Sequence, residues 1–216
     1  MKEMEVKGII FDLDGVICHT DEYHYRAWKK VADKYGIYFD RKINDRLRGV
    51  GRIESLDIIL EYADRNYSDW QKREMAEEKN EIYKELLGTM TKEDLSKEVS
   101  ETLKELKKRG YRMAIGSSSR NTKYILERIG LSDFFDAISD GTNITRSKPD
   151  PEVFLKAAEF IGEKPCDCLV VEDAIAGVDA AVAGDFYSAG IGEAAGHPKV
   201  TVRLNEFGQL LDVCPQ

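Results

Sequence analysis

The stretch that decides the fold is Gly8-Ile9-Ile10-Phe11-Asp12-Leu13-Asp14-Gly15. Its apolar first half is typical of a buried strand, and the strand delivers two carboxylates, one residue apart, followed by a glycine. In open α/β sheets, functional groups gather in the crevice at the carboxyl ends of the strands. Two carboxylates this close are costly to hold together without a cation or a shared proton. The stretch therefore predicts a charged site that binds a cation.

The size and charge of the chain exclude several classes of protein. Its 216 residues can form one domain or a domain with a large insertion. A formal net charge of −8 argues against nucleic acid or an anionic membrane as the partner. A small phosphorylated ligand remains compatible with this charge, because a few local cations can dominate one pocket. No run of 18 apolar residues occurs, so we expect no membrane span.

The cysteines predict a reducing compartment. The chain has four of them, at positions 18, 166, 168 and 214. The pair Cys166-Asp167-Cys168 lacks the two-residue spacing of a redox or zinc motif, and no histidine cluster accompanies it. We therefore expect four free thiols and a cytoplasmic protein.

Helical patterns dominate the chain after the first strand. Apolar residues at helical spacing predict helices over about 22–35, around 53–63 and over about 68–87. A basic loop, residues 46–52, separates the first two. Lys79 falls on the apolar stripe of the third helix, so we expect it to point inward toward a cleft.

From about residue 95, helices and strands alternate. Apolar runs predict strands at 112–116, 137–139 and 168–171, and a short strand at 200–202. In the sequence Lys148-Pro149-Asp150-Pro151, we expect Asp150 to cap a helix that begins at Pro151. Alternation of this kind favours an α/β fold, a parallel sheet with helices on both faces.

The order of these patterns predicts two domains. One strand precedes the helical block, and the other strands of the sheet follow it, so the block is best interpreted as an insertion after the first strand. We expect a discontinuous core domain formed by residues 1–18 and 92–216, and an inserted helical domain formed by residues 19–91.

Residues suited to phosphoryl chemistry follow several predicted strands. They are Asp12 with Asp14, the turn 117–121, Lys148, and Glu172 with Asp173. Each taken alone is compatible with a turn, a helix cap or a surface side chain. Together they lie at one edge of a parallel sheet, where clustered carboxylates suit Mg²⁺. Hydroxyls, helix N-terminal N–H groups and a lysine suit a phosphoryl group.

The chemistry of the residue types allows different roles for the two aspartates. A carboxylate can take a phosphoryl group as an aspartyl-phosphate, and a second one nearby can act as general acid and base. Three other candidates have plain alternatives. His24 lies in phase with Trp28 and can be a packed core histidine, and Arg48 and Arg52 can belong to a solvated loop.

These motifs resemble the haloacid dehalogenase superfamily and, within it, the beta-phosphoglucomutase family. The resemblance covers nearly the whole chain and is carried by Phe11 to Ile17, Glu22 to His24 with Arg26 to Trp28, Leu47 to Val50 with Arg52, Lys79-Asn80, Ser147 to Pro149, and Glu172-Asp173 followed by Ala176-Gly177. It implies a Rossmann-like parallel core, at 1–18 and 92–216, with a helical cap at 19–91 that closes over the substrate.

The resemblance also implies roles for individual residues. It makes Asp12 the nucleophile and Asp14 the general acid and base. It implies that Asp12, the backbone carbonyl of Asp14 and Asp173 hold Mg²⁺ with Glu172 close by. It places Ser117, the N–H of Ser118 and Lys148 on the transferred phosphate, and it assigns the remaining substrate contacts to Thr20, His24, Arg48, Gly49, Arg52, Lys79, Ser119, Arg120 and Asn121.

The implied activity is the interconversion of beta-glucose 1-phosphate and glucose 6-phosphate through a bisphosphate intermediate. The alternative is a sugar-phosphate phosphatase of the same superfamily. A phospho-receiver signalling module also uses an aspartyl-phosphate, but its acid pair precedes the phosphorylated residue and it lacks the helical insertion. We expect a monomer, with a small sugar phosphate as ligand.

Four positions depart from the family pattern, and the Pro-Gly that commonly precedes the core helix is absent around Ser96 to Val99. Arg48 replaces a lysine, Gly51 a serine, Ser118 a small apolar residue and Ala174 a polar one. The first two lie in the loop expected to face the sugar, so they bear on the choice of substrate more than on the phosphoryl chemistry.

Overall fold

A computed structural model describes residues 5–215 of the chain. Its centre is a parallel sheet with the strand order β3-β2-β1-β4-β5-β6. The ends of the predicted core domain, residues 1–4 and 216, lie outside the described residues. The strands are β1 (Gly8–Phe11), β2 (Arg112–Gly116), β3 (Ala137–Ser139), β4 (Cys168–Glu172), β5 (Tyr187–Ile191) and β6 (Val202–Leu204).

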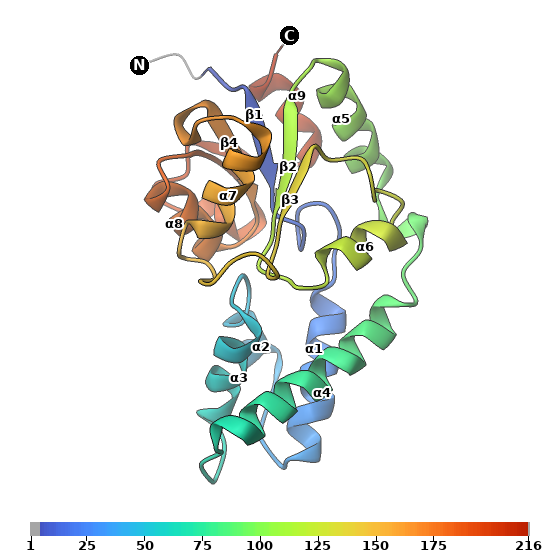
Figure 1. The fold of residues 1–216 in the computed structure, drawn as a ribbon, viewed down its shortest axis with the longest axis vertical. Helices are drawn as coiled ribbons and strands as arrows, with labels where there is room; N and C mark the ends of the chain where they lie inside the picture. The colour runs from blue at the N-terminus through green and yellow to red at the C-terminus, as the bar shows by residue number, and fades with distance from the viewer. Residues whose placement is uncertain (1–4, 216) are drawn as a thin grey trace.

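The α-helices fall into two groups along the chain. The first group follows β1 directly, and the second alternates with the later strands (Figure 1). The first consists of α1 (Asp21–Lys34), α2 (Arg41–Asp45), α3 (Arg52–Leu60) and α4 (Asp69–Leu87). The second consists of α5 (Lys97–Lys108), α6 (Thr122–Arg128), α7 (Glu152–Ile161), α8 (Ile175–Ala183) and α9 (Leu210–Val213).

Strand β1 lies in the middle of the sheet because its side chains are apolar on both faces. It pairs in parallel with β2 on one side and β4 on the other. Ile9 and Phe11 belong to one hydrophobic cluster, and Ile10 belongs to the cluster on the opposite face. This alternation follows from the two-residue period of a strand, and it confirms a sheet covered on both faces. The fold class is therefore the predicted one.

The helices α1 to α4 form a layer of their own beyond the carboxyl ends of β1 and β2 (Figure 1). They share a hydrophobic cluster that includes Trp28, Phe39, Leu56 and Met75. Lys79 is only 3% exposed, as its place on the apolar stripe of α4 predicts. This layer is the helical cap of the fold, and its boundaries at 19 and 91 stay a prediction.

Two local predictions are wrong, and one short helix is unpredicted. The last strand is β6 rather than 200–202, because the chain turns at Val200, whose N–H donates to the carbonyl of His197. Helix α2 forms in a segment for which the sequence patterns predict no helix. Its first turn is capped by Asp40, which accepts the N–H of Ile43. Helix α7 begins at Glu152, although Asp150 does accept its N–H at 3.0 Å.

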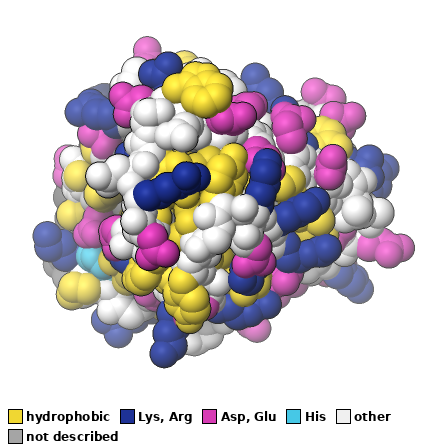
Figure 2. Space-filling view, turned by 90° about the horizontal axis from the view of Figure 1, so that it is seen from below, with side chains coloured by type: hydrophobic (Ala, Val, Ile, Leu, Met, Phe, Trp, Pro, Cys, Tyr) yellow, Lys and Arg dark blue, Asp and Glu magenta, His cyan; other side chains and the backbone are white. Residues whose placement is uncertain are grey.

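Two further findings on residues 5–215 concern the cysteines and the helices. All four cysteines are free thiols. Among the described helices, none combines the length and the apolar character needed to cross a membrane. Seen from the cap side, the surface carries basic, acidic and hydrophobic side chains interspersed with one another (Figure 2).

Candidate active site

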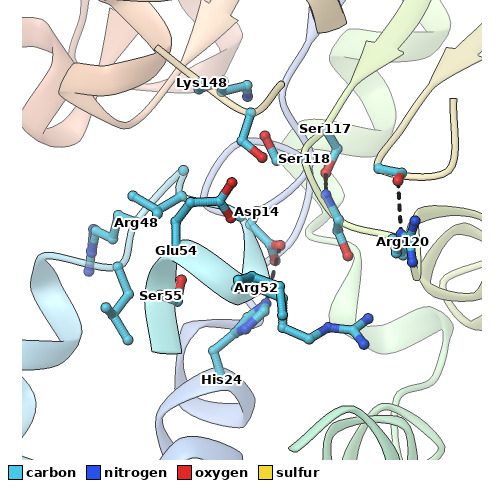
Figure 3. Close-up of a pocket in the computed structure, with 18 of the residues that line it drawn as sticks. Asp14, His24, Arg48, Arg52, Glu54, Ser55, Ser117, Ser118, Arg120 and Lys148 are labelled. Carbon is cyan, nitrogen blue, oxygen red and sulfur yellow. Dashed lines mark hydrogen bonds and ion pairs between the residues drawn. The ribbon is translucent and has the colours of Figure 1, made fainter. Parts of the chain in front are cut away.

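A cavity of about 780 Å³ lies between the carboxyl edge of the sheet and the cap. Two regions of it are named here. The near end is formed by Asp12, Ser117, Ser118, Lys148, Glu172 and Asp173, and the far end by Arg52, Lys79, Ser119, Arg120 and Asn121. Asp14 and His24 line the space between them (Figure 3). Every predicted site residue lines the cavity except Thr20, which is fully buried beside it.

Lys148 is the centre of charge at the near end. It lies in the loop between β3 and α7, is 3% exposed, and donates hydrogen bonds to Asp12 Oδ1 and, at 2.5 Å, to Glu172 Oε1. Burial alone would lower the pKa of its ammonium, but the two carboxylates outweigh burial and raise the pKa above its ordinary value. Lys148 is therefore a permanent cation beside Asp12.

Three carboxylates surround this one ammonium. Oxygens of Asp12, Glu172 and Asp173 lie within 4.8 Å of one another. Burial raises the pKa of Asp12 well above its ordinary value, Lys148 opposes this, and the two neighbouring acids add to it. Burial, followed by the charge of Glu172, likewise raises the pKa of Asp173 to about 7. Like charges in a dry site produce these shifts, which a bound cation would relieve.

The three carboxylates fit a hard divalent cation. With Lys148 they carry a net charge of −2 when all are ionised, and every donor is an oxygen, the ligand type that Mg²⁺ prefers. The carboxylate of Asp14 is outside this cluster. The prediction that its backbone carbonyl contributes a ligand is untested.

Two glycines make room for the acid pair. Gly15 has a φ of +85°, and a side chain there would overlap the carboxylate of Asp173. Gly177 lies in the first turn of the helix after the pair, and a side chain there would overlap the carboxylate of Glu172. The glycines of both motifs thus allow β1, β4 and α8 to bring their acids together.

Ser117 and Ser118 directly follow β2 and line the near end (Figure 3). The hydroxyl oxygen of Ser117 accepts the N–H of Ser119 at 3.2 Å, which leaves its own proton available to a ligand. The hydroxyl oxygen of Ser118 is buried without a hydrogen-bond partner among the described residues. The hydroxyl proton of Ser117 is therefore available to an anion bound beside Asp12.

A line of polar groups supports Asp14 from the cap side. Thr20 Oγ1 donates to Asp14 Oδ1 and itself accepts the hydroxyl proton of Tyr83 at 2.9 Å. On the other side, His24 Nε2 lies 3.7 Å from Asp14 Oδ2, and His24 Nδ1 lies 2.8 Å from Lys79 Nζ. Lys79 donates here, so His24 presents its Nε2–H to Asp14.

The pKa values in this line favour an ionised Asp14. Burial works against its charge, but His24 and Thr20 outweigh burial and hold the pKa of Asp14 below its ordinary value. Burial and the charge of Lys79 lower the pKa of His24. Burial, followed by the charge of Arg52, lowers the pKa of Lys79 to about 7. Asp14 is therefore in its base form at neutral pH.

The far end combines groups from the cap and from the core. Arg52 begins α3, and its Nη1 donates to Glu77 at 3.2 Å. Burial lowers the pKa of Arg52, and the charge of Arg120 adds to this effect. Arg120 is exposed and donates from Nε to the carbonyl of Gly141. Asn121 is buried and donates to Asn80 of the cap at 3.0 Å. Cations and amides at this end can receive a second anion.

The loop between α2 and α3 approaches the core beside the acid pair Glu172-Asp173. Arg48 Nη2 lies 3.2 Å from Asp21 Oδ2, and Arg48 Nη1 lies 3.8 Å from Asp173 Oδ2. The Nε of Arg48 is buried without a partner among the described residues. Gly49 has a φ of +72° and faces Ala174 of the core. The predicted sugar-facing loop is therefore in the cavity.

Several residues of the site or its support were assigned no role from the sequence, and Asn80 is one of them although it belongs to a motif of the resemblance. Glu54 and Ser55 of α3 line the cavity (Figure 3), as does Glu77 of α4. Asn80 accepts a hydrogen bond from Asn121, and the hydroxyl of Tyr83 donates one to Thr20. The signal that could have found two of them is a polar residue at a helix position on the buried face. Ser55 and Asn80 are 4% and 5% exposed, on helix faces that are mostly apolar.

Comparison with known proteins decides the family. Residues 6–185 match the family model of the haloacid dehalogenase-like hydrolases. The chain belongs to this family. The match extends from the residues just before β1 to those just before β5, and so includes both acid pairs, Lys148 and the cap.

Several members of the family are similar to the chain over most of its length. A beta-phosphoglucomutase of Bacillus subtilis is 42% identical over 190 residues, 87% of this chain and 84% of that protein. A beta-phosphoglucomutase structure from Clostridium difficile has a TM-score of 0.90 at 39% identity, covering 95% of this chain and 93% of that one. A phosphorylated carbohydrates phosphatase of Thermotoga maritima is 31% identical, covering 82% of this chain and 80% of that protein.

These similarities confirm the resemblance to the beta-phosphoglucomutases and the prediction of an enzyme of their kind, an isomerase. They support a phosphomutase or a phosphatase of the haloacid dehalogenase family.

Proposed function

We propose that the protein is a Mg²⁺-dependent phosphomutase that interconverts beta-glucose 1-phosphate and glucose 6-phosphate. The proposed route runs through an aspartyl-phosphate on Asp12 and a glucose 1,6-bisphosphate intermediate. Similarity to the beta-phosphoglucomutases of Bacillus subtilis and Clostridium difficile supports this substrate.

One observation carries the proposal: a single cavity has a site for an anion at each end. Lys148, Ser117 and Ser118 line the near end, and Arg52 with Lys79 and Asn121 forms the far end. A bisphosphate requires two such sites, and a sugar monophosphate that binds in either orientation requires the same two. The nucleophile is at the near end only, so turning the sugar round exchanges the phosphate that is transferred.

Asp12 is the proposed nucleophile. Lys148 holds one of its carboxylate oxygens, Oδ1, and no hydrogen bond from a described residue occupies the other. The free oxygen attacks phosphorus, an O–P bond to the enzyme forms, and the bond between phosphorus and the sugar oxygen breaks. Ser117, Ser118 and Lys148 hold the phosphoryl oxygens during the transfer.

Asp14 is the proposed general acid and base. Its ionised state suits the step in which a sugar hydroxyl attacks the aspartyl-phosphate and gives up its proton to Asp14. In the reverse direction, the protonated carboxyl returns that proton to the departing sugar oxygen. Thr20 and His24 hold the carboxylate in place for both directions.

Asp12, Glu172 and Asp173 are the residues that would hold Mg²⁺. When bound, the ion supplies positive charge that offsets the negative charge of the phosphoryl group. The protein's own contribution is to orient Glu172, whose Oε1 is held by Lys148 and whose Oε2 accepts the N–H of Ala174 at 2.9 Å.

The cap, proposed as residues 19–91, determines what reaches Asp12. Arg48, Gly49 and Arg52 enter the cavity from the cap loop and the start of α3, and His24 and Lys79 enter from α1 and α4. We infer that closure of the cap excludes water, so that a sugar hydroxyl rather than water takes the phosphoryl group.

A single assay tests the proposal. Purified protein with Mg²⁺ is given beta-glucose 1-phosphate and a trace of glucose 1,6-bisphosphate, and glucose 6-phosphate and free phosphate are followed together. The proposal predicts glucose 6-phosphate with little free phosphate. Stoichiometric free phosphate without glucose 6-phosphate would instead identify a sugar-phosphate phosphatase, the activity named for the Thermotoga maritima relative.

A further inference from the structure

A buried amide pair joins the cap to the core at the far end. Asn121, which lies directly before α6, donates from Nδ2 to Oδ1 of Asn80 in the cap helix α4, at 3.0 Å. The two residues are 8% and 5% exposed. Because both amides are buried, removing one would leave polar atoms of the other without a partner.

The same helix also holds Arg52. Glu77 precedes Asn80 by one helical turn; it accepts Arg52 Nη1 at 3.2 Å through Oε2, and Asn80 Nδ2 at 3.5 Å through Oε1. A continuous chain of polar contacts therefore runs from Arg52 through Glu77 and Asn80 to Asn121. It connects a cap group and a core group that both line the far end.

We propose that Asn80 is a positioning residue, which acts on the far phosphate through Asn121. The inference rests on the proposed function, in which Arg52 and Asn121 bind that phosphate. By accepting one N–H of Asn121, Asn80 fixes the rotation of the Asn121 amide. It also fixes the distance between α4 and the core, and so the spacing of the two phosphate-binding groups.

Glu77, in contrast, opposes binding of the far phosphate. Its side chain is 66% exposed, and its carboxylate occupies the guanidinium that a phosphate would bind. An incoming phosphate must compete with it for Arg52. Glu77 therefore keeps Arg52 ordered while the site is empty of substrate, and the wild-type affinity for the far phosphate is lower than Arg52 alone would give.

The test of Asn80 separates binding at the far end from the chemistry at the near end. In Asn80→Ala, we expect the KM for the sugar phosphate to rise about tenfold while kcat changes by less than about threefold. Turnover of a small acyl phosphate, which has no far phosphate, should stay unchanged. The control is Asn66→Ala, an exposed cap asparagine outside the cavity, which should match the wild type in both assays.

A double mutant shows whether Asn80 acts through Asn121. In an Asn121→Ala background, Asn80→Ala should add little further change in KM, because the amide it orients is gone. Asn80→Ser replaces Asn80→Ala, with the same predictions, if the alanine variant does not fold. Glu77→Gln should lower the KM by about twofold, since an exposed ion pair is weak competition.

Three results would overturn the inference: an unchanged KM in Asn80→Ala, an equal loss of acyl-phosphate turnover, or fully additive effects in the double mutant. Failure of the proposed function looks different, because the wild type itself would then form no glucose 6-phosphate.

Discussion

The two ends of the cavity differ in the domains that supply their residues and in how exposed their charged side chains are. At the near end, Lys148, Asp12 and Glu172 all belong to the core, are less than a tenth exposed and contact one another directly. At the far end, groups from the cap and the core meet: Lys79 and Asn121 are buried, but the side chain of Arg52 is 20% exposed and that of its partner Glu77 is 66% exposed. Charges act strongly in a dry, rigid site and weakly in a solvated one. We infer that the near end performs the chemistry and that the far end selects and orients the substrate.

The largest effect should come from the nucleophile. Asp12→Asn keeps the shape of the near end but removes the attacking carboxylate, so we expect kcat to fall by about 10⁴-fold or more. Steady-state formation of glucose 6-phosphate measures it, with Asp133→Asn on the core surface as the control. Appreciable residual turnover would remove Asp12 from this role.

The next largest effect should come from Asp14→Ala. Loss of the general acid and base should lower kcat by about 10²- to 10⁴-fold for the sugar phosphate. An acyl phosphate has a leaving group that needs no proton, so phosphorylation of the enzyme by it should change much less. A loss of equal size with both substrates would show that Asp14 does not handle the proton.

At the far end, Arg52→Ala should act mainly on binding. Removing a charged hydrogen-bond donor costs about 1.5–3 kcal/mol, so the KM for the sugar phosphate should rise roughly 10- to 100-fold. We expect a much smaller change in kcat, and partial recovery of the KM in Arg52→Lys. A variant that loses kcat and keeps the KM would contradict the division between the two ends.

The smallest effect is one on stability. Lys79 has a pKa of about 7 in the folded state, below its ordinary value of 10.5, so the unfolded chain binds its proton more readily. Its contribution therefore makes unfolding harder as the pH rises from about 7, by at most about 1.4 kcal/mol per pH unit. Lys79→Met should flatten this rise in denaturant titrations between pH 7 and 9. An unchanged slope would contradict the depressed pKa.

The near end was predictable because strand ends converge. The apolar runs of β1 and β4 could be read from the sequence, and parallel strands place their carboxyl ends at one edge. Asp12, Glu172 and Asp173 are therefore brought together by the fold alone. Lys148 follows the predicted strand at 137–139, which ends at the same edge of the sheet, and the same reasoning placed it nearby.

The far end was only partly predictable, because it depends on how the cap meets the core. Helical phase showed that Lys79 points inward, but phase assigns a face and gives no partner on another element. The contacts of Glu77 and Asn80 are therefore absent from the sequence interpretation. Short elements fixed by single contacts, such as α2 with its Asp40 cap and β6 beside β5, were missed or misplaced for the same reason.

The most direct test of the account is to locate the phosphoryl group after mixing the enzyme with labelled glucose 1,6-bisphosphate and quenching rapidly. Peptide mapping should find the label on Asp12 in the wild type, and also in Arg52→Ala at a raised bisphosphate concentration, because the far end serves binding. Asp12→Asn should carry none. Label on a different residue, or an Arg52→Ala enzyme that stays unlabelled at saturation, would contradict the separation of chemistry and recognition.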